Sequence, residues 1–69
     1  MNYANVLRSL IAHLGSGDTQ GFYYYLRYMP SIPANAIERK FYERLKIDGN
    51  INAACRAAKR VAKNFLGHI

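Results

Sequence analysis

The segment from Asp48 to Leu66 constrains the fold of this chain more than any other stretch. It opens with Gly49-Asn50, a pair typical of one helix ending and the next beginning. The residues that follow are rich in Ala, Arg and Lys, which are strong helix formers, and include no Asp or Glu. An apolar stripe recurs among them at helical spacing through Ile51, Ala54, Cys55, Ala58, Val61, Ala62 and Phe65. The segment therefore predicts a helical region with one apolar and one cationic face.

Apolar spacing elsewhere predicts three further helices, because apolar side chains recur every three or four residues in each segment. With the basic segment, the predicted helical ranges are 2–14, 18–29, 35–47 and 50–66. No two strand-like runs are joined by a hairpin turn signal. The predicted fold class is all-α, a small four-helix domain.

Turn and capping residues set the predicted boundaries. Gly15-Ser16-Gly17 ends the first helix, and Asp18 is a suitable N-cap for the second. Pro30 and Pro33 end the second helix and form a turn. Asn35, followed three residues later by a Glu, resembles a capping box for the third helix.

The chain has 69 residues, so it forms one domain, residues 1–69, with a small hydrophobic core. It has one cysteine, Cys55, and two distant histidines; an intramolecular disulfide is impossible, and no zinc-ligand spacing is present. We expect a homodimer, because oligomerisation is a common way to stabilise a domain with so small a core. The unpaired cysteine, an amino terminus without a signal peptide's charged region, and the lack of a long apolar stretch predict a cytoplasmic protein that does not act on a membrane.

The net charge is +6, and the sequence pI is near 9.8. A small chain this basic implies an anionic partner, with nucleic acid first and an anionic membrane surface or an acidic protein second. The apolar face of the basic segment is largely alanine, which disfavours the membrane. No nucleophile, base and carboxylate stand at catalytic spacing, and no glycine-rich phosphate loop is present. We therefore predict no enzyme activity, no cofactor and no metal.

The C-terminal half resembles the Fis family (factor for inversion stimulation) and the Fis-type domains of bacterial enhancer-binding activators. The matching residues are Gly49-Asn50, Ala53-Ala54, Ala57-Ala58-Lys59 and Lys63-Asn64-Phe65. Helix-turn-helix segments of phage small terminases are also similar. The resemblance implies a helix before Gly49, a scaffold helix with the alanines and a recognition helix with the basic residues. Two departures from the family pattern matter. Ala58-Lys59-Arg60-Val61 lacks the family's usual turn residue, and the stretch from Lys59 to Asn64 is one residue longer than in the family.

Two conformations of residues 50–66 remain open. The unbroken apolar stripe is explained by a single continuous amphipathic helix, whereas the resemblance implies a C-terminal helix-turn-helix. Either form can bind phosphates, but only the bent form presents a separate recognition helix to the major groove.

The candidate DNA-binding residues all lie in the basic segment. Lys63 and Asn64 are candidates for base contacts, since a cation pairs with guanine edges and an amide with adenine. Arg56, Lys59 and Arg60 are candidates for phosphate contacts. The full candidate set is Asn52, Arg56, Lys59, Arg60, Lys63 and Asn64.

These features predict a small basic protein that binds duplex DNA, either as a transcriptional regulator or as a DNA-architectural accessory factor. Residues 1–30 would form the dimer and residues 35–69 would meet DNA. The alternative is a helical protein-interaction module, a phage- or plasmid-type adaptor or inhibitor that docks on an acidic protein. A third is an RNA-binding protein that stacks bases on the tyrosines between Tyr23 and Tyr28.

Overall fold

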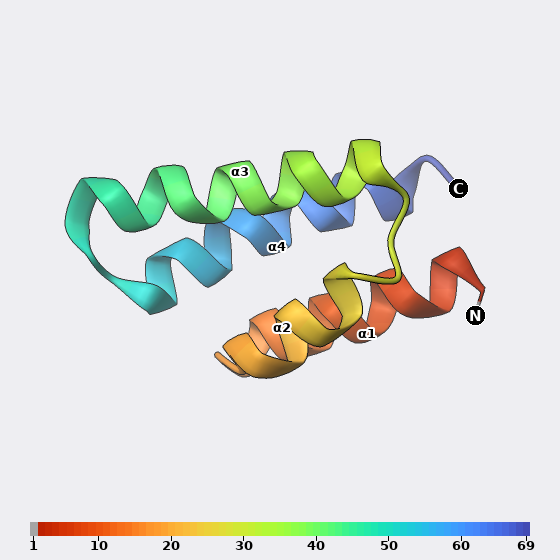
Figure 1. Cartoon of the computed structure of the whole chain (residues 1–69), viewed down its shortest axis with the longest axis horizontal. Coiled ribbons are helices and arrows are strands. Elements are labelled where there is room, and N and C mark those ends of the chain that lie inside the picture. Colours follow the sequence, from red (N-terminus) through yellow and green to blue (C-terminus); the bar gives the residue numbers. More distant parts are fainter. Residues whose placement is uncertain (1) are drawn as a thin grey trace.

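The computed structural model describes residues 2–69, which contain four helices and no strand. The helices are α1 (Tyr3–Gly15), α2 (Thr19–Leu26), α3 (Ser31–Asp48) and α4 (Ile51–Gly67). The predicted all-α, four-helix fold is confirmed. Figure 1 shows two antiparallel helix pairs, the longer formed by α3 and α4 and the shorter by α1 and α2. Because α4 packs against both α3 and α1, it joins the two pairs.

Three polar side chains begin helices by capping free backbone N–H groups. The Asn2 carboxamide accepts from the Ala4 amide at 2.8 Å, so the predicted start at residue 2 is the cap of α1. Asp18 accepts from the Gly21 amide at 3.0 Å and caps α2 as predicted. Asn50 caps α4 in the same way, as predicted. Each bond satisfies an amide that has no partner within its own helix.

The second helix is shorter than predicted. Helix α2 ends at Leu26 rather than at residue 29, and the amides of Tyr28 and Met29 donate to carbonyls three residues earlier, each at 3.1 Å. This tighter spacing is that of a turn, so the chain leaves the helix before Pro30. Met29 is nevertheless buried, because the turn folds its side chain back onto the core.

The third helix begins earlier than predicted, and the capping box at Asn35 is wrong. Helix α3 starts at Ser31, with Pro30 at its N-cap and Pro33 in its first turn. First-turn amides lack intrahelical acceptors, so a proline there loses no hydrogen bond. Asn35 lies inside the helix and is exposed. Gly49 ends α3 in the left-handed region at φ 64°, as predicted.

The core lies where the four apolar faces meet. Phe22 of α2 and Phe41 of α3 pack with ring centroids 5.1 Å apart, while α1 contributes mainly leucines. Helix α4 presents Ala54, Ala58 and Ala62, all fully buried. Their small side chains let α4 approach its neighbours closely. Cys55 is also buried, as predicted, but Ile51 at the start of the predicted stripe is half exposed.

Gly21 lies beneath a polar pair that joins α1 to α2. His13 Nδ1 and Asp18 Oδ2 are 2.9 Å apart, and the His13 ring stacks on Tyr25 at 5.3 Å. The backbone amide of Gly21 holds the pKa of the Asp18 carboxyl below its usual value, as do the adjacent His13 contacts. A Cβ at residue 21 would overlap His13 and Asp18.

We expect Gly21→Ala to destabilise the domain by about 1–2 kcal/mol, although alanine favours helix formation by nearly 1 kcal/mol. The new methyl group would separate His13 from Asp18 and disturb the α2 cap. Thermal unfolding followed by circular dichroism should show a Tm lower by about 4–16 °C. Gly67→Ala is the matched control, because nothing lies within 4 Å of a Cβ there and its Tm should not fall. An equal Tm for Gly21→Ala and the parent would contradict this packing.

Candidate nucleic-acid interface

Helix α4 is one continuous helix from Ile51 to Gly67. Of the two conformations that the sequence left open for residues 50–66, the structure therefore has the unbroken amphipathic helix. No turn separates a scaffold helix from a recognition helix near Ala58, so the split that the resemblance implies is not formed. The tight turn in the C-terminal half is Gly49-Asn50, and it joins the two long helices α3 and α4.

The cationic residues of α4 gather on the side away from the core. Successive residues of an α-helix are rotated by about 100°, which places Arg56 and Lys63 within about 20° of one another. The buried Ala58 then lies on the opposite side of the helix. Four cations together line one shallow hollow of about 200 Å³, and we call them the basic ridge: Arg56, Lys59, Arg60 and Lys63.

The basic ridge is not neutralised within residues 2–69. The ion pairs there join His13 to Asp18, Lys40 to Glu43 at 4.0 Å, and Arg44 to Asp48 at 3.3 Å, and none includes a ridge residue. Helix α4 itself contains no Asp or Glu. The four charges therefore repel one another on a solvent-exposed surface, and an anion bound there would relieve that repulsion.

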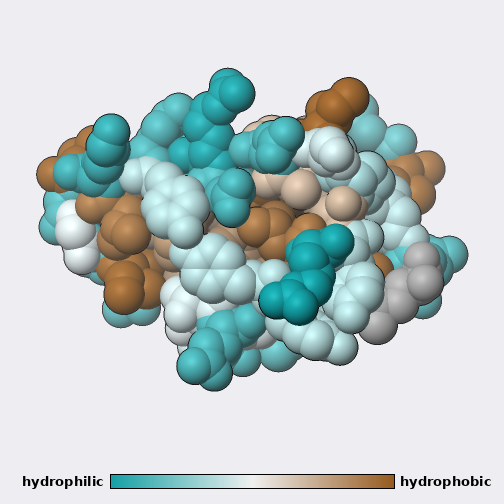
Figure 2. Space-filling view, viewed as in Figure 1, coloured by the Kyte–Doolittle hydropathy of each residue, from teal (hydrophilic) through white to brown (hydrophobic). Residues whose placement is uncertain are grey.

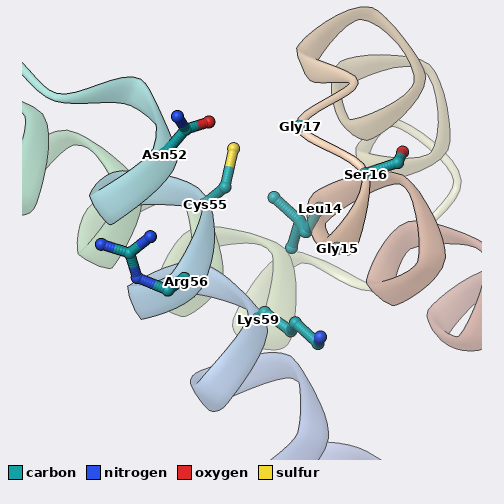
Figure 3. A pocket seen from close by; sticks show the side chains of 8 residues that line it. All are labelled: Leu14, Gly15, Ser16, Gly17, Asn52, Cys55, Arg56 and Lys59. Atoms are coloured by element: carbon teal, nitrogen blue, oxygen red, sulfur yellow. The ribbon is translucent and has the colours of Figure 1, made fainter.

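Lys59 and Asn52 also border a second, deeper cleft of about 380 Å³ between α4 and the α1–α2 turn (Figure 3). The Lys59 Nζ atom would lie 3.3 Å from a Cβ built on Gly15, at the C-terminal end of α1. That end carries partial negative charge, which a lysine compensates. Lys59 is half-buried, whereas Arg56, Arg60 and Lys63 are exposed. Lys59 therefore stands at the edge of the ridge, with its ammonium toward α1.

Cys55 faces the same cleft in Figure 3 but is only 2% exposed. Burial raises the pKa of its thiol, which keeps the sulfur protonated and weakly nucleophilic. Leu14 forms part of the opposite wall. Cys55 thus acts as a small core residue, in agreement with its place on the apolar stripe.

Arg44 of α3 is a residue that the sequence reasoning missed. It lines a hollow of about 180 Å³ with Arg56 and Arg60 of α4. The position of the turn could have indicated this contact. In two antiparallel helices joined at Gly49-Asn50, residues equally distant from the turn lie side by side, and these include residue 44 on one helix and residue 55 or 56 on the other. Arg44 extends the cationic surface onto α3, although its exposed pair with Asp48 offsets part of its charge.

Asn64 and Asn52 border the basic ridge but do not line its hollow. Asn64 lines the hollow of about 260 Å³ between α3 and α4, next to Arg60. Asn52 belongs to the cleft beside Gly17. The structure thus brings four of the six candidate residues into one hollow, with the two asparagines at its borders. Base contact by Asn64 and Lys63 stays a prediction.

Comparison with known proteins adds no relative: no family model, curated protein or solved structure shows a significant match to this chain. None of the helices in residues 2–69 combines the length and apolar character that a bilayer-spanning helix needs.

Proposed function

We propose that this protein binds duplex DNA by seating the phosphate backbone along the basic ridge of α4. The main observation behind this proposal is that one exposed hollow is lined by Arg56, Lys59, Arg60 and Lys63. None of these four side chains makes an ion pair within the described chain. Clustered, unpaired Arg and Lys are what a polyanion requires, because each phosphate contact releases condensed counterions.

The shape of the ridge supports contact with more than one phosphate. From Arg56 to Lys63 the helix rises about 10 Å, at about 1.5 Å per residue. Arg44 broadens the surface beside Arg56 and Arg60. Such a charged strip follows a backbone better than it encloses a small anion, since its hollow is shallow and open.

An architectural accessory role fits this ridge better than sequence-specific regulation. Phosphate contacts position a protein on DNA but carry no sequence information directly. A single continuous α4 provides no separate recognition helix after a turn. The predicted cytoplasmic location and homodimer belong to the same proposal, and a dimer would carry two ridges and gain affinity from both.

The test is a titration of random-sequence duplex at two salt concentrations. With four phosphate contacts and a slope near −0.9 per contact, affinity should fall about 150-fold between about 50 and about 200 mM salt. Fluorescence anisotropy of a labelled duplex measures both constants. Two duplexes of unrelated sequence should bind within a few-fold of one another if backbone contact dominates.

Absence of duplex binding at low salt would overturn the proposal. The chain would then be better explained as the helical interaction module, with the same ridge docking on an acidic protein. Tight binding to a structured RNA, with no binding to duplex DNA at the same salt concentration, would instead favour the hypothesis of an RNA-binding protein.

A further inference from the structure

Four exposed tyrosines form a surface on α2, on the turn that follows it and on α3, away from the basic ridge. Tyr23 is 37% exposed, Tyr24 47%, Tyr28 49% and Tyr42 44%. Figure 2 shows pale aromatic rings gathered on this face, with apolar side chains visible between them. We call these four residues, with Arg27 and Glu38, the tyrosine face. Exposed aromatic clusters of this kind mark protein interfaces, where Tyr and Arg provide much of the binding energy.

The rings of the tyrosine face are already fixed by contacts within the chain. The Tyr23 and Tyr42 hydroxyls are 2.7 Å apart, which ties α2 to α3. Tyr24 meets Tyr28 edge-on, with ring centroids 5.5 Å apart. The Arg27 guanidinium lies 6.0 Å from the centre of the Tyr24 ring. A partner would therefore bind a largely ordered surface, so little side-chain freedom is lost on association.

Glu38 differs from the other acidic residues of the chain. The chain has four of them, and Asp18, Glu43 and Asp48 each pair with a basic group, whereas Glu38 makes no ion pair within residues 2–69. It lines a broad groove of about 400 Å³ with Tyr23 and Arg27. Burial and the Tyr42 hydroxyl raise the pKa of Tyr23 to about 12, with a further contribution from the nearby Glu38 charge.

Arg27 is likewise without an ion pair in the described chain, although it lines the same groove as Glu38. The two opposite charges thus line one groove without forming an ion pair with each other. A nucleic acid does not fit this groove well, because the Glu38 carboxylate repels phosphate. A surface with one free cation and one free anion is complementary to itself under two-fold symmetry.

We propose that the tyrosine face binds a second copy of this chain, with Arg27 of each protomer paired to Glu38 of the other. The inference rests on the homodimer of the proposed function and assigns its interface; it does not depend on DNA. A standard interface takes about 800 Å² from each partner. That is less than a fifth of the 4480 Å² surface of the chain. The basic ridge lies on α4 and shares no residue with the groove of the tyrosine face, so this pairing does not use the ridge.

Charge reversal tests the interface, with sedimentation equilibrium as the readout. The parent should be a dimer at high micromolar concentration. Arg27→Glu and Glu38→Arg should each weaken dimerisation by at least about tenfold, because two-fold symmetry places like charges together twice. The double variant Arg27→Glu/Glu38→Arg should restore the parent dissociation constant to within a few-fold.

Arg8→Glu is the matched control, since Arg8 is exposed on α1 and its side chain bonds only to Asn5 among the residues that the structure describes. It should change the dimer constant less than either reversal on the tyrosine face. A monomeric parent overturns the dimer itself. A dimeric parent that is unaffected by both single reversals, or not rescued by the double variant, overturns the assigned surface. Neither result alters the outcome of the duplex titration, so failure of the interface and failure of DNA binding are distinguishable.

Discussion

Replacing Arg56, Arg60 and Lys63 together with alanine should weaken duplex binding on the order of a thousandfold at about 50 mM salt. Each lost phosphate contact lowers the slope of log K against log salt by about 0.9, so three losses lower it by about 2.7. Affinity of the variant should then change only about three- to fourfold between about 50 and about 200 mM salt. These three side chains are exposed, and alanine favours helix, so the fold should persist.

A matched variant separates local contact from net charge. Arg8, Arg39 and Lys46 are also exposed, lie on helices and line none of the hollows beside α4. Replacing these three with alanine removes the same total charge but should keep most of the salt slope. Equal slopes for the two triple variants would show that net charge, rather than the ridge, governs binding. A ridge variant that binds as tightly as the parent would remove the basis of the proposed function.

Replacing Phe22 with alanine should leave little folded protein at 37 °C. Phe22 is fully buried, and its ring packs at 5.1 Å from those of both Phe41 and Tyr23. Loss of such a side chain destabilises a core by about 3–5 kcal/mol. A chain of this size has a total stability of roughly 3–10 kcal/mol, at about 0.05–0.15 kcal/mol per residue. Urea unfolding followed by circular dichroism measures the change.

Phe22→Leu is the control for that experiment, because it retains an apolar side chain of similar size. Its free energy of unfolding should fall by less than about 1.5 kcal/mol. If Phe22→Ala unfolds at the same urea concentration as the parent, the buried Phe22 side chain is not a main support of the fold.

Most of the secondary structure could be predicted from local signals. Asp18 and Asn50 cap helices in the structure for the reason that their side chains suggested, and Gly49 ends α3 with positive φ. The errors fell around the two prolines. Pro33 was read as a turn residue but occupies the first turn of α3, where a missing amide hydrogen has no consequence. A proline pattern alone does not distinguish these two positions.

The candidate interface could be predicted only in part. Residues 56, 59, 60 and 63 share a side of any regular helix, so their grouping followed from periodicity. Arg44 was missed because it joins the group through packing of α3 against α4. Lys59 was predicted as an ordinary phosphate ligand, yet its ammonium lies beside Gly15 of α1, a proximity that spacing along α4 does not contain.

The sequence by itself determined the helical character of the chain, three of the four helix starts within a residue, and a cationic side of α4, since each depends on neighbours within a few positions. Tertiary structure alone decided that α4 runs unbroken from Ile51 to Gly67 and that its alanines pack against α1 and α3. It also placed Glu38 in a groove with Arg27. Contacts between distant segments depend on how whole helices pack, and the energies that choose among packings are not properties of any short stretch of sequence.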